Sequence, residues 1–360
     1  MHLNVGNLAH FLIHRGLLDT DTVVTGDLTI VDSSRRNRNF KVTSNAGLGL
    51  FVKHIRQTQA DGALALRREA TCYGLAGDDP VLSRLMPRLI SYDADRNVLI
   101  TELIGDAENL FEYHQRLKIF PTDVGLMLGE GLGSYHAQAE GRLQRQPSQA
   151  LFAREVPVIL TLGRAGHSAL DQLGHIGPAL ASVIQQHEDF RELLDALGAE
   201  WRFDSLIHGD IKWDNVLVYP GKGGLDFRIV DWELADFGDA AWDVGAVFQS
   251  FLVPWILSMP IASGLPPETY IDMASEPIED MRPVLHAFWR VYAARRGFDD
   301  VQRNRELERC LRFGAARLVW AALELRFHSA QLDPASTALL QVSHNILKDP
   351  SRAVGDLLGV

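Results

Sequence analysis

The sequence lacks the patterns expected of a disulfide-bonded, zinc-bound or nucleic-acid-binding protein. Only two of its 360 residues are cysteines, Cys72 and Cys310, and they lie far apart in the chain. They support neither a disulfide framework nor a metal cage, and they suit a reducing cytoplasm. Its 35 basic residues are outnumbered by 46 acidic residues, which gives a net charge of −11. This balance argues against nucleic acid as a partner, although a locally basic pocket for an anionic ligand remains compatible with it.

Targeting and membrane-spanning patterns are also missing. The first 20 residues contain no unbroken apolar run behind a basic start, so they do not have the pattern of a signal peptide. Leu8, Phe11 and Leu12 instead suit one face of a short helix. The stretch 244–267 carries no charge, but two prolines interrupt it, which favours a buried helix followed by a loop over a membrane span. We therefore expect a cytoplasmic protein without a membrane partner.

The first hundred residues have mostly a strand pattern, and the pattern becomes helical beyond residue 109. Short β-type runs are predicted at 28–32, 40–43, 50–55 and 98–101, with one helix at 63–75. Helices are predicted at 122–139, 178–197, 284–295, 303–328 and 337–347, and a β-hairpin is predicted around the glycine-rich turn 220–224. The pattern predicts an α+β protein with a small strand-rich lobe (1–103), a hinge (104–108) and a large helical lobe (109–360).

The strongest chemical signal is a polar loop that leads from an apolar pair into a strand. It contains Asp210 and Asn215, five positions apart, and Asp231 follows at the end of the next predicted strand. A carboxylate at a strand end, close to an Asp/Asn loop, is a suitable arrangement for a divalent cation. Mg²⁺ prefers oxygen ligands and often takes only one or two of them from protein, while phosphates supply others.

These residues resemble motifs of a known enzyme family. His208-Gly209-Asp210 followed by Asn215 resembles the catalytic loop of the aminoglycoside phosphotransferase (APH) and choline kinase-like family, whose members are related to protein kinases. The segment 229–245 is similar to the family's metal-binding segment. The resemblance implies a bilobal protein-kinase-like fold, in which Asp210 orients or deprotonates an acceptor hydroxyl. It also implies that Asn215 and Asp231 hold Mg²⁺ against the phosphates of ATP, and that Asp243 braces the catalytic loop.

The small lobe contains the further residues that this resemblance implies. Lys53 lies on the third predicted strand, and Glu69 lies on the helix that follows. Such a pair would direct the lysine ammonium at the α- and β-phosphates of ATP. The predicted strand 98–101 and the residues that follow it, Glu102, Leu103 and Ile104, resemble the strand and hinge of the family. The resemblance implies that adenine would bond to the backbone there.

Three features depart from the kinase pattern. The loop 33–39 contains no glycine; Ser34 and Arg35 could meet phosphate there, or the loop could be an ordinary solvated turn. Lys212 lies two residues after Asp210, as in protein serine/threonine kinases, where such a lysine contacts the transferring phosphate. Glu233 stands where protein kinases have glycine, and the acidic run that it opens either faces a cationic or polyhydroxyl acceptor or is a charged exposed turn.

The sequence therefore predicts an ATP- and Mg²⁺-dependent phosphotransferase that acts on the hydroxyl of a small-molecule metabolite or antibiotic. Two alternatives remain open. The acceptor could be a Ser or Thr of a protein or a ribosomal peptide in natural-product biosynthesis, which Lys212 favours. The protein could also be a nucleotide-binding pseudokinase or scaffold, which only the glycine-free loop favours.

Overall fold

The computed structural model describes residues 2–34, 37–56, 60–139, 151–162, 177–261, 267–325 and 332–359. The chain divides into two compact units. The first joins Met1–Leu110 to Asn215–Ala235, and the second joins Phe111–Asp214 to Asp236–Val360. The hairpin that carries Asn215 and Asp231 thus belongs to the same unit as the N-terminal strands. The lobe boundaries that we expected stay a prediction.

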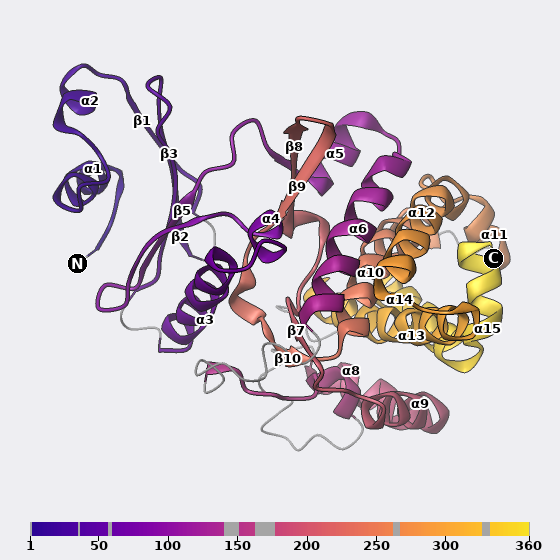
Figure 1. Ribbon diagram of the computed structural model, residues 1–360. Helices are drawn as coiled ribbons and strands as arrows, with labels where there is room; N and C mark the ends of the chain where they lie inside the picture. Colours follow the sequence, from indigo (N-terminus) through magenta and orange to yellow (C-terminus); the bar gives the residue numbers. More distant parts are fainter. Residues whose placement is uncertain are drawn as a thin grey trace. The chain divides into compact units, whose positions relative to one another are not determined.

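The first unit is built on a five-stranded antiparallel sheet with the strand order β1-β2-β3-β5-β4. Strands β1, β2, β3 and β5 are labelled in Figure 1. Its strands are β1 (Leu28–Asp32), β2 (Arg38–Ser44), β3 (Gly49–His54), β4 (Leu89–Asp93) and β5 (Val98–Glu102). A second antiparallel sheet contains β6 (Glu108–Asn109), β8 (Val216–Gly221) and β9 (Gly224–Ile229). The helices of this unit are α1 (Val5–His14), α2 (Thr20–Val24), α3 (Ala60–Gly77) and α4 (Leu82–Leu85), with the 3₁₀ turn η5 (Trp232–Leu234).

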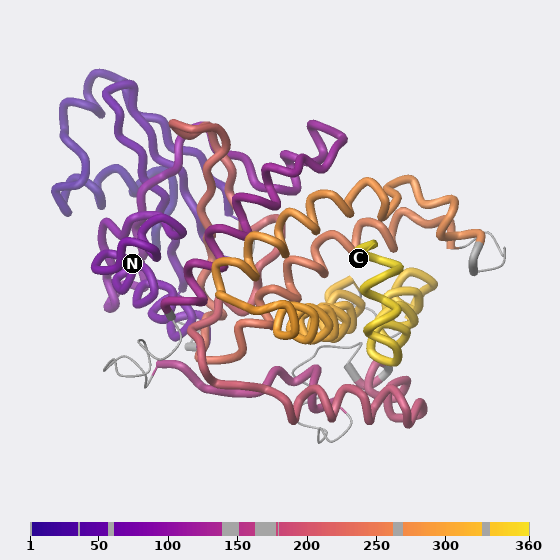
Figure 2. Tube along the Cα trace, turned by 45° about the vertical axis from the view of Figure 1, so that its right-hand side comes forward, coloured from indigo at the N-terminus to yellow at the C-terminus, as the bar shows by residue number. Residues whose placement is uncertain are grey.

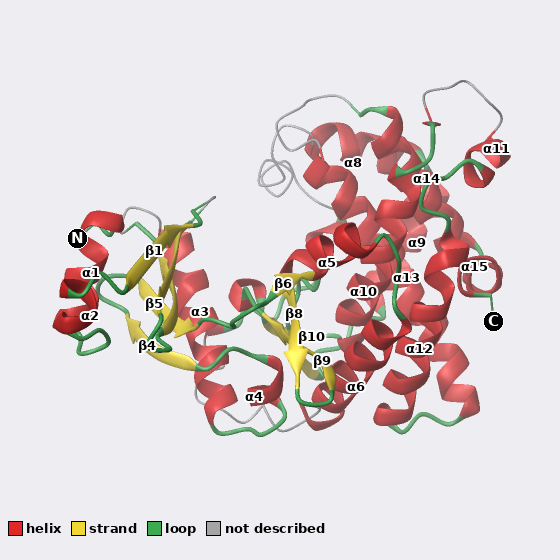
Figure 3. Cartoon of the chain, turned by 90° about the horizontal axis from the view of Figure 1, so that it is seen from above, coloured by secondary structure: helices red, strands yellow, loops and turns green. Residues whose placement is uncertain are grey.

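Helices α1 and α3 lie on opposite sides of the five-stranded sheet, as the view from above shows (Figure 3). The predicted N-terminal helix is confirmed, and its buried residues Leu8, Phe11 and Leu12 pack in one core with Val52 of β3. Successive side chains of a strand point to opposite faces of the sheet. Because Val52 faces α1, its neighbour Lys53 faces α3, and this alternation brings Lys53 to the helix that carries its expected partner.

The second unit is mostly helical. Its helices are α5 (Leu110–Leu117), α6 (Thr122–Ala139), α8 (Gly177–Gln186), α9 (Glu188–Ala199), α10 (Ala240–Leu257), α11 (Pro267–Asp272), α12 (Ile278–Arg296), α13 (Asp300–Leu325), α14 (Pro334–Lys348) and α15 (Pro350–Ala353). Its described residues also form short elements: the two-stranded sheet of β7 (Ser205–Ile207) and β10 (Asp236–Gly238), the 3₁₀ turns η3 (Val158–Thr161) and η4 (Trp213–Asn215), and the π-helical turn η7 (Val354–Leu358). The C-terminal segment, yellow in Figure 2, lies against the orange helices, and the Arg282 side chain of α12 donates hydrogen bonds to its carbonyl groups.

Two packing features fix the centre of this unit. Helix α6 presents Gly125, Gly129 and Gly133 to α12, and a Cβ atom at Gly129 would lie 2.5 Å from the carbonyl oxygen of Phe288. The missing side chains therefore allow the two helix backbones to approach closely.

Helix α10 contains an 18-residue window long and apolar enough to cross a membrane, but 78% of this window is buried inside the protein. Helix α10 is therefore a core helix, which confirms the buried helix predicted from the uncharged stretch 244–267.

The α+β class and the antiparallel N-terminal strands are confirmed, and several details of the prediction are corrected. The single helix predicted at 178–197 is two helices, α8 and α9, because His187 leaves the helical region with φ −101° and ψ 88°. Strand β4 was not predicted. The strand predicted to end at Asp231 ends at Ile229 instead. The predicted end of the helix 303–328 lies outside the described residues.

Candidate active site

The buried Lys53 lies among three carboxylates in the first unit, of which Glu69 is buried and Asp231 and Glu233 are partly exposed. Its Nζ atom donates to Glu69 Oε2 at 2.8 Å, to Asp231 Oδ1 at 2.5 Å and to Glu233 Oε2 at 3.2 Å. Burial disfavours the charged form of Lys53, but the three carboxylates outweigh it and raise the pKa of the amine. Lys53 is therefore a fixed positive charge in this site. The hydroxyl of Tyr73 donates to the second oxygen of Glu69 at 3.1 Å and orients that carboxylate.

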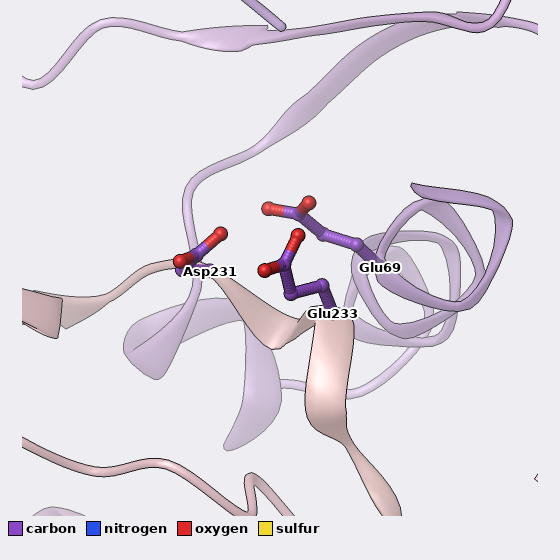
Figure 4. A group of neighbouring side chains, drawn as sticks. All are labelled: Glu69, Asp231 and Glu233. Carbon is purple, nitrogen blue, oxygen red and sulfur yellow. The ribbon is translucent and has the colours of Figure 1, made fainter. Parts of the chain in front are cut away.

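The three carboxylates converge on one point (Figure 4). One oxygen from each of Glu69, Asp231 and Glu233 lies within 4.8 Å of the others. Asp231 has a left-handed backbone with φ 68° and ψ 51°, which is uncommon for a residue other than glycine and recurs at functional sites. This conformation turns the chain from the end of β9 into η5, so that Asp231 and Glu233 both face Lys53. Arg68 donates to the carbonyl oxygen of Glu233 at 3.2 Å and fixes the turn from α3.

The carboxylate cluster opens into a cavity of about 260 Å³ that lies entirely within the first unit. The cavity is lined by Asn39, Lys41, Phe51, Lys53, Glu69, Tyr73, Pro87, Leu99, Thr101, Glu102, Leu103, Ile104, Ala107, Asn215, Leu217, Val230 and Asp231. The structure thus brings seven predicted residues into one cavity: Lys53, Glu69, Glu102, Leu103, Ile104, Asn215 and Asp231. A hydrogen bond of 2.9 Å from the amide of Val230 to the carbonyl of Asn215 holds the two predicted metal-ligand segments together.

Two backbone amides of the predicted hinge already have hydrogen-bond partners within the protein, which limits the donors that it can offer to a planar ligand. The amide of Glu102 donates to the Arg88 carbonyl at 2.9 Å, and the amide of Leu103 donates to the Gly49 carbonyl at 3.0 Å. Because both amides are engaged, these two residues would offer carbonyl oxygens to an adenine. The backbone amide that donates to a ring nitrogen of the adenine would then be that of Ile104. These assignments stay predictions.

The glycine-free loop between β1 and β2 is stabilised by its own side chains. The amide of Ser34 donates to Asp32 Oδ1 at 2.9 Å, and the Ser34 hydroxyl accepts from the amide of Asn39 at 3.1 Å. Ser34 thus links the end of β1 to the start of β2 where the kinase pattern has glycine. Whether Ser34 meets phosphate stays a prediction, and Arg35 lies outside the described residues.

In the second unit, Asp243 holds the loop that carries Asp210. Its carboxylate, on the first turn of α10, accepts from the amides of His208 at 2.7 Å and Gly209 at 2.9 Å. The fully buried His136 lies 3.6 Å from the same carboxylate and contacts the Tyr292 hydroxyl at 3.0 Å. The structure thus gives Asp243 the bracing contacts that the resemblance implied.

Asp210 is fixed by two cations. Its Oδ1 lies 3.3 Å from Arg317 Nη2, and its Oδ2 lies 2.9 Å from Lys212 Nζ. Burial opposes ionisation of this carboxyl, but Arg317 and Lys212 outweigh it and lower its pKa. The carboxylate is therefore ionised at neutral pH, as a group that orients or deprotonates a hydroxyl must be. Lys212 also lies 4.0 Å from Glu324 on α13.

The model of the phosphotransferase enzyme family (APH) matches residues 27–265, about two-thirds of the chain. The chain belongs to this family. The match covers the predicted residues from Lys53 to Asp231, and it leaves α12, α13 and α14 outside.

Phosphotransferases and kinases are also found among individual relatives and solved structures. A 4-hydroxytryptamine kinase from Psilocybe cubensis is 25% identical over 181 residues, which are 48% of this chain and 47% of the relative. The chain thus matches about half the length of this curated relative. The macrolide 2′-phosphotransferase MphH from Brachybacterium faecium has a TM-score of 0.51 and 16% identity, and the match covers 93% of this chain and 98% of that one. The phosphotransferase APH(2″)-IIa, in a complex with streptomycin and ATP, has a TM-score of 0.50 and 13% identity over 96% and 99% of the two chains. These likenesses support the protein-kinase-like fold.

The structure adds residues that the sequence motifs of the phosphotransferase family did not indicate. Arg317 is the most informative of them, because its side chain is only 3% exposed. It donates to the Gly209 carbonyl at 2.9 Å and to Gln249 Oε1 at 2.8 Å, and it stacks over the Trp242 ring. The available signal was a single charge in the apolar stretch 313–323 of a helix. Tyr73 gave no signal, because a tyrosine on a helix is ordinarily a core residue.

Proposed function

We propose that this phosphotransferase transfers the γ-phosphoryl group of ATP to a hydroxyl group of a small molecule. The observation that carries the proposal is the cavity in which Lys53, Glu69, Asn215 and Asp231 meet the predicted hinge residues. A buried, permanently charged lysine beside acidic ligands suits a triphosphate with a bound cation. The family match and the kinases among the relatives support the same reaction.

The donor atoms in the cavity fit a divalent cation such as Mg²⁺. Glu69 and Asp231 line the cavity, and their carboxylate oxygens lie close to that of Glu233. Asn215, whose side chain contains an amide oxygen, lines the same cavity. Three carboxylates face one ammonium group, so the site carries an excess of negative charge that a cation would compensate. In the proposal, Asn215 and Asp231 would hold the ion. When bound, it would neutralise charge on the phosphates.

The proposed transfer makes one bond and breaks one. The acceptor oxygen bonds to the γ-phosphorus while the bond from that phosphorus to the β,γ-bridging oxygen breaks, and ADP leaves with the electron pair. The proton of the hydroxyl passes to Asp210, which its two cationic partners keep ionised. The contribution of the protein is positioning and charge stabilisation more than covalent chemistry.

Replacing Asp231 with alanine tests the nucleotide side of this proposal. We expect the affinity for Mg·ATP to fall by at least about tenfold, which corresponds to ~1.4 kcal/mol, because a ligand of the cation is lost. Isothermal titration calorimetry with a non-hydrolysable ATP analogue and MgCl₂ measures this change. Asp226→Ala, on the exposed part of the same hairpin, is the matched control and should bind like the wild type. Equal affinities in the Asp231 and Asp226 variants would refute the cation-binding role.

ATP turnover separates the proposed enzyme from a pseudokinase. A phosphotransferase should hydrolyse ATP slowly without an acceptor and faster with one, which an ADP-release assay detects. A pseudokinase would be stabilised by Mg·ATP in a thermal unfolding assay without releasing ADP. This second result would replace the enzyme by a nucleotide-binding scaffold.

A further inference from the structure

The second unit contains a cleft of about 590 Å³ that begins beside the loop of Asp210. Lys212 lines it, and Lys212 Nζ lies 2.9 Å from the carboxylate of Asp210. The volume is in the range of sites for small molecules. If the proposed function is correct, an acceptor whose hydroxyl meets Asp210 has its remaining atoms in this cleft.

The walls of the cleft are mostly apolar. Phe111, Leu257 and Leu325 line it, and their exposed fractions of 47%, 39% and 46% are high for large apolar side chains. Trp213 and Val253 extend the same surface. Exposed apolar side chains that gather around one concavity indicate a ligand with an apolar surface of its own.

The polar side chains of the cleft are largely engaged within the protein. The hydroxyl of Ser250 donates to the Ala246 carbonyl at 2.9 Å, and that of Ser258 donates to the Trp255 carbonyl at 2.8 Å. The side-chain amide oxygen of Gln249, Oε1, accepts a hydrogen bond from Arg317. A ligand with many hydroxyl groups would lose its hydrogen bonds to water without gaining an equal number here, which is costly.

The charge of the cleft is negative. Asp214, Glu276 and Glu324 line it together with a single base, Lys212, which already contacts Asp210 and Glu324. Glu276 is half-buried, and within the described part of the chain its carboxylate has neither a hydrogen bond nor an ion pair. A partly buried carboxylate without a partner is the natural counterpart of one ligand cation.

We propose that the acceptor is a small amphipathic amine: a molecule with one reactive hydroxyl, an apolar aromatic body and one protonated amino group that pairs with Glu276. The hydroxyl end lies at Asp210 and Lys212, and the aromatic body packs on Phe111 and Trp213. We expect sugars and aminoglycosides, which carry many hydroxyl groups, to be poor acceptors, because most polar side chains of the cleft are already engaged.

A panel of matched compounds tests this substrate class. Hydroxylated arylalkylamines such as tyramine and 2-amino-1-phenylethanol are compared with their N-acetyl derivatives, which keep the shape but lose the charge, and with glucose and kanamycin. We expect phosphorylation of at least one arylalkylamine, with kcat/KM about tenfold or more above that of its N-acetyl derivative. Equal turnover of amine and N-acetyl compound, preferred turnover of glucose or kanamycin, or no turnover of any arylalkylamine would overturn the inference.

The Glu276→Gln variant tests whether the protonated amino group of the acceptor pairs with Glu276. The ratio of kcat/KM for amine over N-acetyl compound should fall about tenfold, mainly through a higher KM for the amine. Glu279→Gln, three residues on and outside the cleft, should keep the wild-type ratio. Thermal unfolding of both variants controls for folding, and an unchanged ratio in Glu276→Gln would contradict the pairing.

ATP turnover without an acceptor separates the proposed substrate class from the proposed function. If ATP turnover persists while the compound panel fails, only the substrate class is wrong. If ATP turnover is absent as well, the proposed function also fails.

Discussion

Replacing Asp210 with asparagine should lower the rate of phosphoryl transfer by about 10²–10⁴-fold and leave the affinity for Mg·ATP close to that of the wild type. Asparagine keeps the size of the side chain but cannot accept the proton of the acceptor hydroxyl. It also removes the negative charge that Arg317 and Lys212 hold in place. The affinity should persist, because Asp210 is not among the residues that line the nucleotide cavity.

Two measurements check this result. An ADP-release assay at saturating acceptor gives kcat, and isothermal titration calorimetry gives the affinity for Mg·ATP. Asp123→Asn, an exposed aspartate at the start of α6, is the matched control and should retain wild-type values in both. Undiminished turnover in Asp210→Asn would remove Asp210 from the mechanism. Lost ATP binding with an intact fold would instead place it in the nucleotide site.

The parts of the fold that the sequence predicts correctly depend on local patterns. Strand β1 has the predicted bounds, and the glycine-rich turn at 220–224 gives the predicted hairpin, because alternation and turn residues act over a few positions. The break at His187 was not predictable in this way. No proline or glycine interrupts the pattern there, so local propensity does not mark the boundary between the two helices.

The candidate site shows the same division between local and distant information. Asp210 and Asn215 are recognisable because they lie in one short motif. The contact of Lys53 with Glu233 joins residues 180 positions apart, and that of Asp210 with Arg317 joins residues 107 positions apart. Such pairs form only when the fold brings them together. A lone arginine in an apolar helix could have indicated a buried partner, but not that the partner is Asp210.

Replacing Arg317 with methionine should impair both catalysis and stability. Removing one member of a buried ion pair leaves the other charge uncompensated, which typically costs ~3–5 kcal/mol of unfolding free energy. Lys212 still contacts Asp210 in this variant, so we expect the lower end of that range, about 3 kcal/mol. Urea unfolding measures the loss. Arg312 lies on the same helix as Arg317 and forms a partly exposed ion pair with Glu200 at the end of α9. Arg312→Met is therefore the control and should cost at most about 1 kcal/mol.

The pH dependence of kcat/KM distinguishes a positioning role of Arg317 from a purely structural one. Asp210 must be ionised to act, so activity is lost as the pH falls through its pKa. Burial raises this pKa, while Arg317 and Lys212 lower it below its usual value. Without the guanidinium the pKa of Asp210 rises, and the acid limb of the profile moves to higher pH. Arg317→Lys keeps a positive charge and should restore the limb toward its wild-type position. If the limb in the methionine and lysine variants coincides with that of the wild type, Arg317 supports the fold without tuning Asp210.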